Sequence, residues 1–192
     1  MILPIYSLDG LNKDRGTMKA RERYFIAASY CMGTNVLEIS CASGYGSNIL
    51  AQQANSILAC DIDQKALSFC KQHWSNDRVI YKHADLSDPQ LDLGKFNCVV
   101  SLETIEHVPT PLNVTIKLLS QHVVSNGILI FSCPINEQCE PNQTHKHTRI
   151  SIDSLKQCVK EIDFQLVSII GQHNVLDGTD NYDNYIFVCR RA

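Results

Sequence analysis

Residues 35–47 read Asn-Val-Leu-Glu-Ile-Ser-Cys-Ala-Ser-Gly-Tyr-Gly-Ser, and the fold can be predicted outward from them. The stretch begins with a short apolar run bounded by a turn signal, which is typical of a buried strand. Small residues follow, so the backbone can approach a ligand closely, and the glycines also permit positive φ. Ser47 then predicts the N-cap of a helix that begins near Asn48. Strand, small-residue turn and helix together predict the first crossover of a nucleotide-binding α/β fold.

Strands and helices alternate along the chain until the pattern changes near its end. We expect helices over residues 17–30, 47–53, 64–73, 111–124 and 151–161, and strands over residues 36–39, 56–60, 79–83, 96–101, 128–131, 164–170 and 185–189. Because the last two strands follow each other directly, they predict an antiparallel hairpin at the end of an otherwise parallel sheet.

The length of 192 residues predicts one domain, residues 1–192, with a single substantial core. Residues 1–16 contain Pro4, Gly10 and Gly16 and are interpreted as a loop-rich N-terminal arm. Residues 135–150 are polar, lack a helix or strand pattern and are long for a connection. We therefore interpret them as a candidate lid over an acceptor pocket.

The composition excludes several classes of function. A net charge of −3 gives no electrostatic reason to expect a nucleic acid or a membrane surface as partner. The sequence shows neither a membrane span nor a signal peptide. The nine cysteines contain no C-x-x-C pair, so we expect no zinc site, and most lie in apolar runs as small core residues. This use of cysteine predicts a reducing compartment, and hence a cytoplasmic location.

Two motifs resemble those of the class I S-adenosylmethionine-dependent methyltransferases. In motif I of that family an acidic residue is followed by three alternating glycines. Glu38 matches the acid and Gly44 the third glycine, whereas Ser40 and Ala42 replace the first two. Since both replacements are small, we expect the turn to survive if φ is negative there. The run Ser-Leu-Glu-Thr-Ile-Glu-His, residues 101–107, resembles the family's motif after the fourth strand.

The resemblance covers residues 17–190 and implies the fold of the family. That fold is α/β, a Rossmann-like seven-stranded, mostly parallel sheet with a C-terminal antiparallel hairpin and helices on both faces. It also implies S-adenosyl-L-methionine as the cofactor. The implied cofactor-binding residues, in chain order, are Tyr24, Glu38, Ser40, Ala42, Gly44, Asp61, Ile62, Asp85, Leu86, Ser101, Leu102 and Glu103.

The resemblance gives several of these residues individual roles. Asp61, which ends the second strand, matches the acid that binds the ribose. Asp85 matches the acid that receives the adenine amino group, with a turn acid ahead of Pro89 as the alternative. The backbone of residues 101–103 would line the methionine moiety. Tyr24 lies in a helix that closes over the cofactor in similar enzymes, or only on a half-buried helix face.

The candidate catalytic residues are Glu106 and His107 after the fourth strand and His145 and His147 in the candidate lid. Histidine is the natural general base near neutral pH, so His107 is a candidate to deprotonate the acceptor. A purely structural histidine in the turn is the alternative. The two lid histidines lack an identifiable third ligand, so we expect no metal.

The resemblance implies methyl transfer to a hydroxyl of a small acceptor, for which a sugar of a glycan or nucleotide-sugar is the favoured choice. A quinone or another small metabolite is the alternative acceptor. A non-catalytic binding domain is the alternative class, because Ser40 and Ala42 make motif I degenerate. The chain could also be one domain of a larger glycan-synthesis protein.

Overall fold

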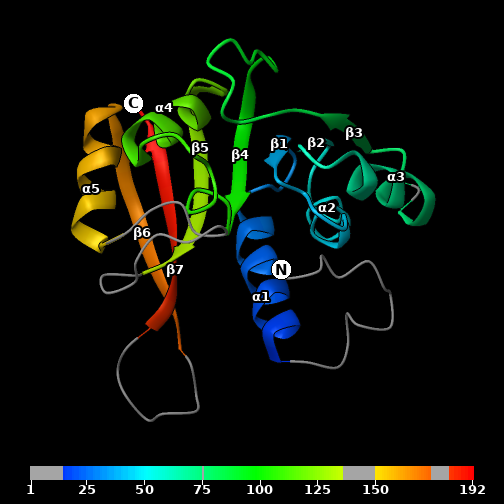
Figure 1. The fold of residues 1–192 in the computed structure, drawn as a ribbon, viewed down its shortest axis with the longest axis horizontal. Coiled ribbons are helices and arrows are strands. Elements are labelled where there is room, and N and C mark those ends of the chain that lie inside the picture. Colours follow the sequence, from blue (N-terminus) through cyan, green and yellow to red (C-terminus); the bar gives the residue numbers. More distant parts are fainter. Residues whose placement is uncertain (1–14, 75, 136–149, 174–181) are drawn as a thin grey trace.

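The computed structural model describes residues 15–74, 76–135, 150–173 and 182–192 (Figure 1). Its elements, in chain order, are α1 (Arg15–Ser29), β1 (Asn35–Ile39), α2 (Tyr45–Leu50), β2 (Ser56–Asp61), α3 (Gln64–His73), β3 (Val79–His83), β4 (Phe96–Leu102), α4 (Leu112–Ser120), β5 (Val123–Pro134), α5 (Ile152–Glu161), β6 (Phe164–His173) and β7 (Tyr182–Arg191). Each predicted strand and helix is present, and the boundaries differ at several ends.

The strands form one seven-stranded sheet in the order β3-β2-β1-β4-β5-β7-β6. Strands β1 to β5 pair in parallel, and β7 pairs antiparallel with both β5 and β6. The predicted fold class, including the C-terminal hairpin, is confirmed. The order reverses direction between β1 and β4, and a crevice beyond the carboxyl ends of such strands is where ligands bind in open α/β sheets.

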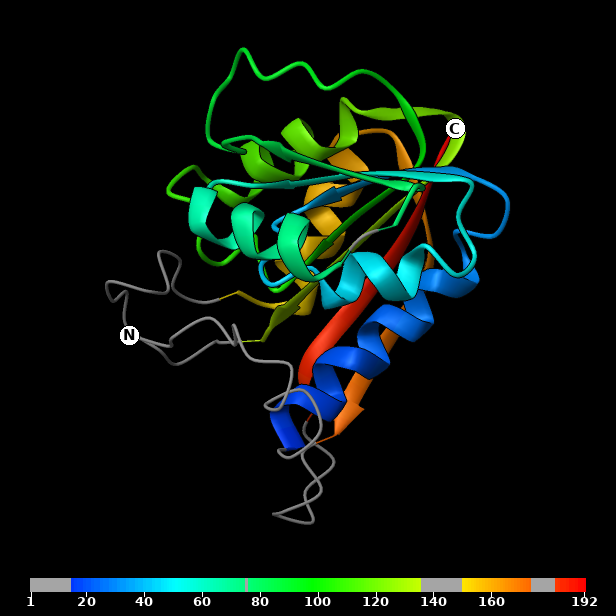
Figure 2. The ribbon, with the colours of Figure 1, turned by 90° about the vertical axis from the view of Figure 1, so that its right-hand side faces the viewer.

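Helices cover both faces of the sheet (Figure 2). On one face α1, α2 and α3 pack their apolar sides on the sheet, and Ala27, Leu50 and Leu67 belong to that core. On the other face α4 and α5 bury Ile116 and Leu155. The two cores explain why β1 and β4 consist almost wholly of buried residues.

Two predicted boundaries are wrong for a local reason. The fourth predicted helix was expected to reach residue 124, but α4 ends at Ser120 and β5 begins at Val123. Asn126 and Gly127, expected to stop the helix, lie inside β5 instead. Asn126 takes a φ of 60°, and a Cβ on Gly127 would lie 2.7 Å from Val123 Cγ1. The Asn-Gly pair therefore makes an irregularity within a strand and not a helix end.

The start of α2 also differs from the prediction. The helix begins at Tyr45 with Gly44 at the N-cap, and no side chain caps it. Ser47 lies inside the helix, where its hydroxyl donates to Glu38. At the N-terminus α1 begins at Arg15, so it takes in the last two residues of the predicted arm.

Some predictions fall outside the part of the chain that the structure describes. Residues 136–149, nearly all of the candidate lid, belong to this group, and with them His145 and His147. Among the residues that are described, no helix has the length and apolar character needed to cross a lipid bilayer.

Candidate active site

A cavity of about 180 Å³ lies beyond the carboxyl ends of β1 to β4. Six of the predicted site residues line it, namely Ser40, Ile62, Asp85, Leu86, Glu103 and His107. Sequence reasoning missed the other six, Ile39, Ala84, Ser87, Thr104, Val108 and Pro109, which are all near neighbours of the predicted ones. Strand order could have found them, because every one lies at or just beyond a strand end on the same edge of the sheet.

The turn after β1 has the backbone of a glycine-rich loop although it contains one glycine. The φ angles are 67° at Ser40, 46° at Ala42 and 78° at Gly44. The condition of negative φ, under which we expected the turn to survive the two replacements, is therefore not met, although the turn is present. L-residues with a Cβ are strained in this left-handed region. The chain thus keeps the turn that the motif requires and accepts strain at two positions.

Asp61 holds this turn from the end of β2. Its Oδ2 accepts the backbone N–H of Ala42 at 2.8 Å, and its Oδ1 accepts that of Asp63 at 2.8 Å. The residue is 9% exposed. A carboxylate offers about four lone-pair sites, so these two bonds leave capacity for a ligand hydroxyl. The neighbouring Ile62 is 60% exposed and presents an apolar side chain to the cavity.

Asp85 is a turn acid that also lines the cavity, and its contact with the adenine amino group stays a prediction. Its Oδ1 accepts the backbone N–H of Ser87 at 2.8 Å and the Ser87 hydroxyl at 2.7 Å, which makes it a turn acid. The same residue lines the cavity beside Leu86. The hydrogen bonds between Asp85 and Ser87 fix the backbone from which the side chains of Asp85 and Leu86 extend.

Glu38 and Tyr24 lie beneath the turn and do not line the cavity. Ser47 donates to Glu38 Oε2 at 2.5 Å, and burial raises the pKa of Glu38 to about 7 against the opposing effect of the Ser47 and Tyr24 hydroxyls. Burial likewise raises the pKa of Tyr24 well above its usual value. A Cβ on Gly46 would lie 2.0 Å from the Tyr24 ring, so only glycine fits there. Tyr24 therefore supports the start of α2 from below.

The end of β4 is fixed by a polar network that the sequence did not reveal. Glu103 has a φ of 52°, and its Oε1 accepts the Ser132 hydroxyl at 2.8 Å. Arg23 of α1 lies 3.8 Å from the other Glu103 oxygen and donates to Gln172 Oε1 of β6 at 2.7 Å. Helix α1 is thereby tied both to the cavity wall and to the hairpin. Ser101 and Leu102 are buried just before Glu103.

His107 and Glu106 occupy different places despite being adjacent. His107 lines the cavity with a side chain that is 41% exposed, whereas Glu106 is 2% exposed and lies behind the wall. Burial, with a smaller contribution from Glu103, raises the pKa of Glu106 to about 8. The Glu106 Oε1 to His107 Nε2 distance of 3.7 Å is too long for a hydrogen bond. Of this pair, His107 is the one placed to meet a ligand.

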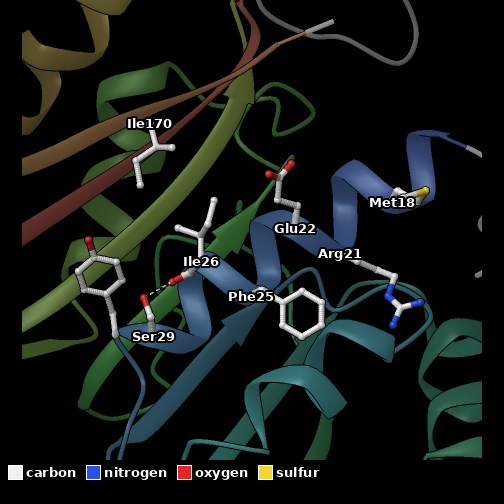
Figure 3. A pocket seen from close by; sticks show the side chains of 8 residues that line it. Met18, Arg21, Glu22, Phe25, Ile26, Ser29 and Ile170 are labelled. Carbon is white, nitrogen blue, oxygen red and sulfur yellow. Dashed lines mark hydrogen bonds between the residues drawn. The ribbon is translucent and has the colours of Figure 1, made fainter. Parts of the chain in front are cut away.

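A second, larger hollow of about 650 Å³ lies between α1 and β6 (Figure 3). It is lined by Met18, Arg21, Glu22, Phe25, Ile26, Ser29, Tyr30 and Ile170. None of the predicted site residues is among these. We therefore place the candidate site in the smaller cavity, where the chemically active side chains are. Among the described residues, no three His, Cys, Asp or Glu side chains are grouped so as to hold a metal ion.

Comparison with known proteins gives the family. The sequence profile described as "Methyltransferase domain" matches residues 37–131, from β1 into β5. The chain carries a class I S-adenosylmethionine-dependent methyltransferase domain. The N-methyltransferase NodS from Bradyrhizobium japonicum WM9, solved with S-adenosyl-L-homocysteine, has the same fold as this methyltransferase domain. The TM-score is 0.74 at 15% identity, covering 95% of this chain and 90% of that one.

Two curated relatives of this methyltransferase are ubiquinone biosynthesis O-methyltransferases. The protein of Burkholderia pseudomallei (strain 1710b) is 24% identical over 190 residues, which cover 86% of this chain and 82% of that protein. The protein of Aromatoleum aromaticum is 32% identical over 103 residues, and there the match spans 52% of this chain and less than half, 44%, of that protein.

The cavity of this methyltransferase suits its cofactor, S-adenosylmethionine. Its lining combines apolar side chains, such as Ile62 and Leu86, with the carboxylates of Asp85 and Glu103. An adenine ring needs apolar contacts on its faces and acceptors at its edge, and a sulfonium is attracted by carboxylates. The buried Ser101 hydroxyl at the end of β4 has no hydrogen-bond partner among the described residues. The cofactor predicted from the sequence is confirmed by the family and its neighbours.

Proposed function

We propose that this methyltransferase transfers a methyl group from S-adenosylmethionine to a hydroxyl oxygen of a small metabolite, and that the acceptor is of the quinone-precursor type. The observation that carries the proposal is His107 in the wall of the cavity that Ser40, Ile62 and Asp85 also line. A titratable imidazole next to the cofactor-binding turn supplies the base that a hydroxyl acceptor needs.

The relatives favour this acceptor over the sugar that the sequence alone suggested. Both are O-methyltransferases of ubiquinone biosynthesis, and one of them aligns with 86% of the chain. The chemistry of a histidine base agrees with them. A phenolic hydroxyl has a pKa near 10, close enough to that of imidazole for efficient proton transfer, whereas an alcohol of a sugar is a much weaker acid.

The residues of the site have separable tasks in this reaction. The bound cofactor supplies a methyl group made electrophilic by a sulfonium. The backbone of residues 40–44 and the carboxylates of Asp61 and Asp85 bind and orient it, which aligns the methyl with the acceptor. His107 would take the proton from the acceptor hydroxyl as its oxygen forms a bond to the methyl carbon, while the bond from that carbon to sulfur breaks and S-adenosylhomocysteine leaves. Glu103, fixed by Ser132 and Arg23, keeps the end of β4 in place.

The turn after β1 supports a catalytic domain over a non-catalytic relative of the fold. If the turn no longer bound a cofactor, we would not expect Ser40 and Ala42 to keep a strained positive φ. Strained backbone persists where the surrounding structure imposes it, and it gathers at functional sites.

Calorimetric titration with S-adenosylmethionine and S-adenosylhomocysteine tests the first half of the proposal, and transfer of labelled methyl tests the second. We expect both ligands to bind at one site, and a simple phenol to be methylated faster than a model glycoside. Binding without transfer to either acceptor class would favour the non-catalytic alternative. Transfer to the glycoside alone would restore the sugar acceptor.

A further inference from the structure

The C-terminal end of α3 reaches back to the cofactor-binding turn and holds its carbonyl groups. Trp74 follows the last residue of the helix, and its indole Nε1–H donates to the backbone oxygen of Ser43 at 2.7 Å. One turn earlier, the Cys70 thiol donates to the backbone oxygen of Ala42 at 3.2 Å. Two consecutive carbonyls of the turn are thus bonded to one helix end.

The same helix end also fills the space beside Gly44. A Cβ on Gly44 would lie 2.7 Å from Cys70 Sγ and 2.9 Å from Trp74 Cδ1. The indole is therefore packed on the turn as well as bonded to it. Since Asp61 binds the N–H of Ala42 from the end of β2, the turn is held between β2 and α3.

This arrangement matters because the turn does not hold its shape by itself. Ser40 and Ala42 occupy left-handed φ angles that glycine would adopt freely. A strained conformation of this kind persists only when neighbouring groups over-determine it. Trp74 and Cys70 are such neighbouring groups, because both donate hydrogen bonds to the turn from outside it. The indole N–H of Trp74 is a stronger donor than the thiol of Cys70.

We propose that Trp74 is a positioning residue for S-adenosylmethionine. Its indole N–H keeps residues 40–44 in the conformation that binds the cofactor, so binding does not have to order the turn. Trp74 does not line the cavity and touches no reacting group. The proposal rests on the cofactor of the domain and is independent of the acceptor.

The alternative is that Trp74 only packs on the core, where it is a partly buried member of the α1–α3 side. Two replacements separate the roles. Trp74→Phe keeps an aromatic ring and removes the donor. Replacement by 3-benzothienylalanine keeps the full bicyclic shape and removes the N–H alone, so it tests the bond even if Trp74→Phe does not fold.

The expected result is a Kd for S-adenosylhomocysteine that rises about tenfold in both variants, the factor that loss of one hydrogen bond gives. Turnover at saturating cofactor should stay near that of the native protein. The matched control is Asp63→Ala, which removes the N-cap of the same helix and should lower the melting temperature without changing the Kd. A Kd within twofold of native for 3-benzothienylalanine would overturn the proposal.

The native protein gives an independent readout, because Trp74 is the sole tryptophan of the sequence. Its indole N–H therefore gives one identifiable signal in a nitrogen-15 correlation spectrum. We expect saturating S-adenosylhomocysteine to slow the exchange of that proton with D2O, because the ligand stabilises the turn to which the proton is bonded. An exchange rate that the ligand leaves unchanged would show that the bond and the site are not coupled.

Discussion

The Asp61 carboxylate accepts the backbone N–H of Ala42 at 2.8 Å, so the end of β2 fixes the turn after β1. Asp61→Asn should therefore weaken cofactor binding through two effects. It removes the charged acceptor that we propose for the ribose, and it loosens the turn. Hydrogen bonds to charged groups contribute about 1.5–3 kcal/mol each, so we expect the calorimetric Kd to rise by at least about tenfold.

The control for this change is Asp92→Asn, because Asp92 accepts the N–H of Gly94 in a similar turn outside the cavity. It should leave the Kd unchanged. An Asp61→Asn protein that folds and binds the cofactor as tightly as the native protein would remove Asp61 from the site.

Glycine at either strained position of the turn should stabilise the protein. Ser40→Gly and Ala42→Gly each relieve a left-handed φ, which costs roughly 1–2 kcal/mol for a residue with a Cβ, offset in part by the greater freedom of glycine in the unfolded chain. We expect a higher melting temperature for both, and unchanged or tighter cofactor binding for Ser40→Gly.

The opposite change, Gly44→Ala, should lower the melting temperature sharply, because the new Cβ would meet Cys70 Sγ. If Ser40→Gly instead abolished cofactor binding, the serine hydroxyl would be a direct ligand contact.

The fold could be predicted from the sequence because its signals are local. The apolar run before Ser40 and the acid at residue 61 mark two successive parallel strands, and the hairpin follows from two strand patterns without a helix between them. Element ends depend on tertiary contacts and were less predictable. Residues 123–127 look like the end of a helix by composition, yet they begin β5. Val123 pairs with Phe96 of β4, and regular pairing resumes at Ile128 after an irregularity in the register.

Stability should fall as the pH rises from about 5 to about 8. Burial raises the pKa of Glu38 to about 7 and that of Glu106 to about 8, so the folded state holds protons that the unfolded state has released. The favourable contribution is complete below the ordinary carboxyl pKa and is lost as the pH passes through the folded values. Denaturant titrations at several pH values measure this slope.

Glu106→Gln should reduce that slope and make the protein more stable than the native chain at pH 8, by up to a few kcal/mol. At pH 4 the two should be alike. Glu161→Gln, at an exposed position on α5, is the control and should leave the slope unchanged. A native stability that rises between pH 5 and 8 would contradict the burial of protonated carboxyls.

His107→Ala should lower turnover by ~10² to 10⁴ and leave cofactor affinity nearly unchanged, because a positioned base acts on the acceptor. The comparison is with His145→Ala and His147→Ala at saturating cofactor. His73→Ala, on the exposed end of α3, controls for loss of an imidazole away from the cavity. Full turnover in His107→Ala with collapse in a lid variant would move the base to the lid, and full turnover in all of them would mean that no histidine base is needed.

The site residues that follow directly after strands were predictable from the sequence. The contacts between segments far apart in the sequence were not. Ser40, Asp85 and His107 each follow a strand, so strand order brings them to one cavity. The bond between Trp74 and Ser43 joins residues 31 positions apart, and that between Arg23 and Gln172 joins residues 149 apart. No local sequence pattern predicts such pairs, because they form only when the helices pack on the sheet.

The position of β7 in the sheet affects how the sheet folds and how it would respond to truncation. It follows β6 along the chain but lies between β5 and β6, and within the described residues β7 is the one strand with which β6 pairs. During folding, β5 keeps an open edge until β7 arrives, and an open edge invites pairing with another molecule. A shortened chain lacking Tyr182–Arg191 would therefore lose two strands from the sheet. Strand β7 would be deleted, and β6 would remain in the chain without the strand through which it joins the sheet.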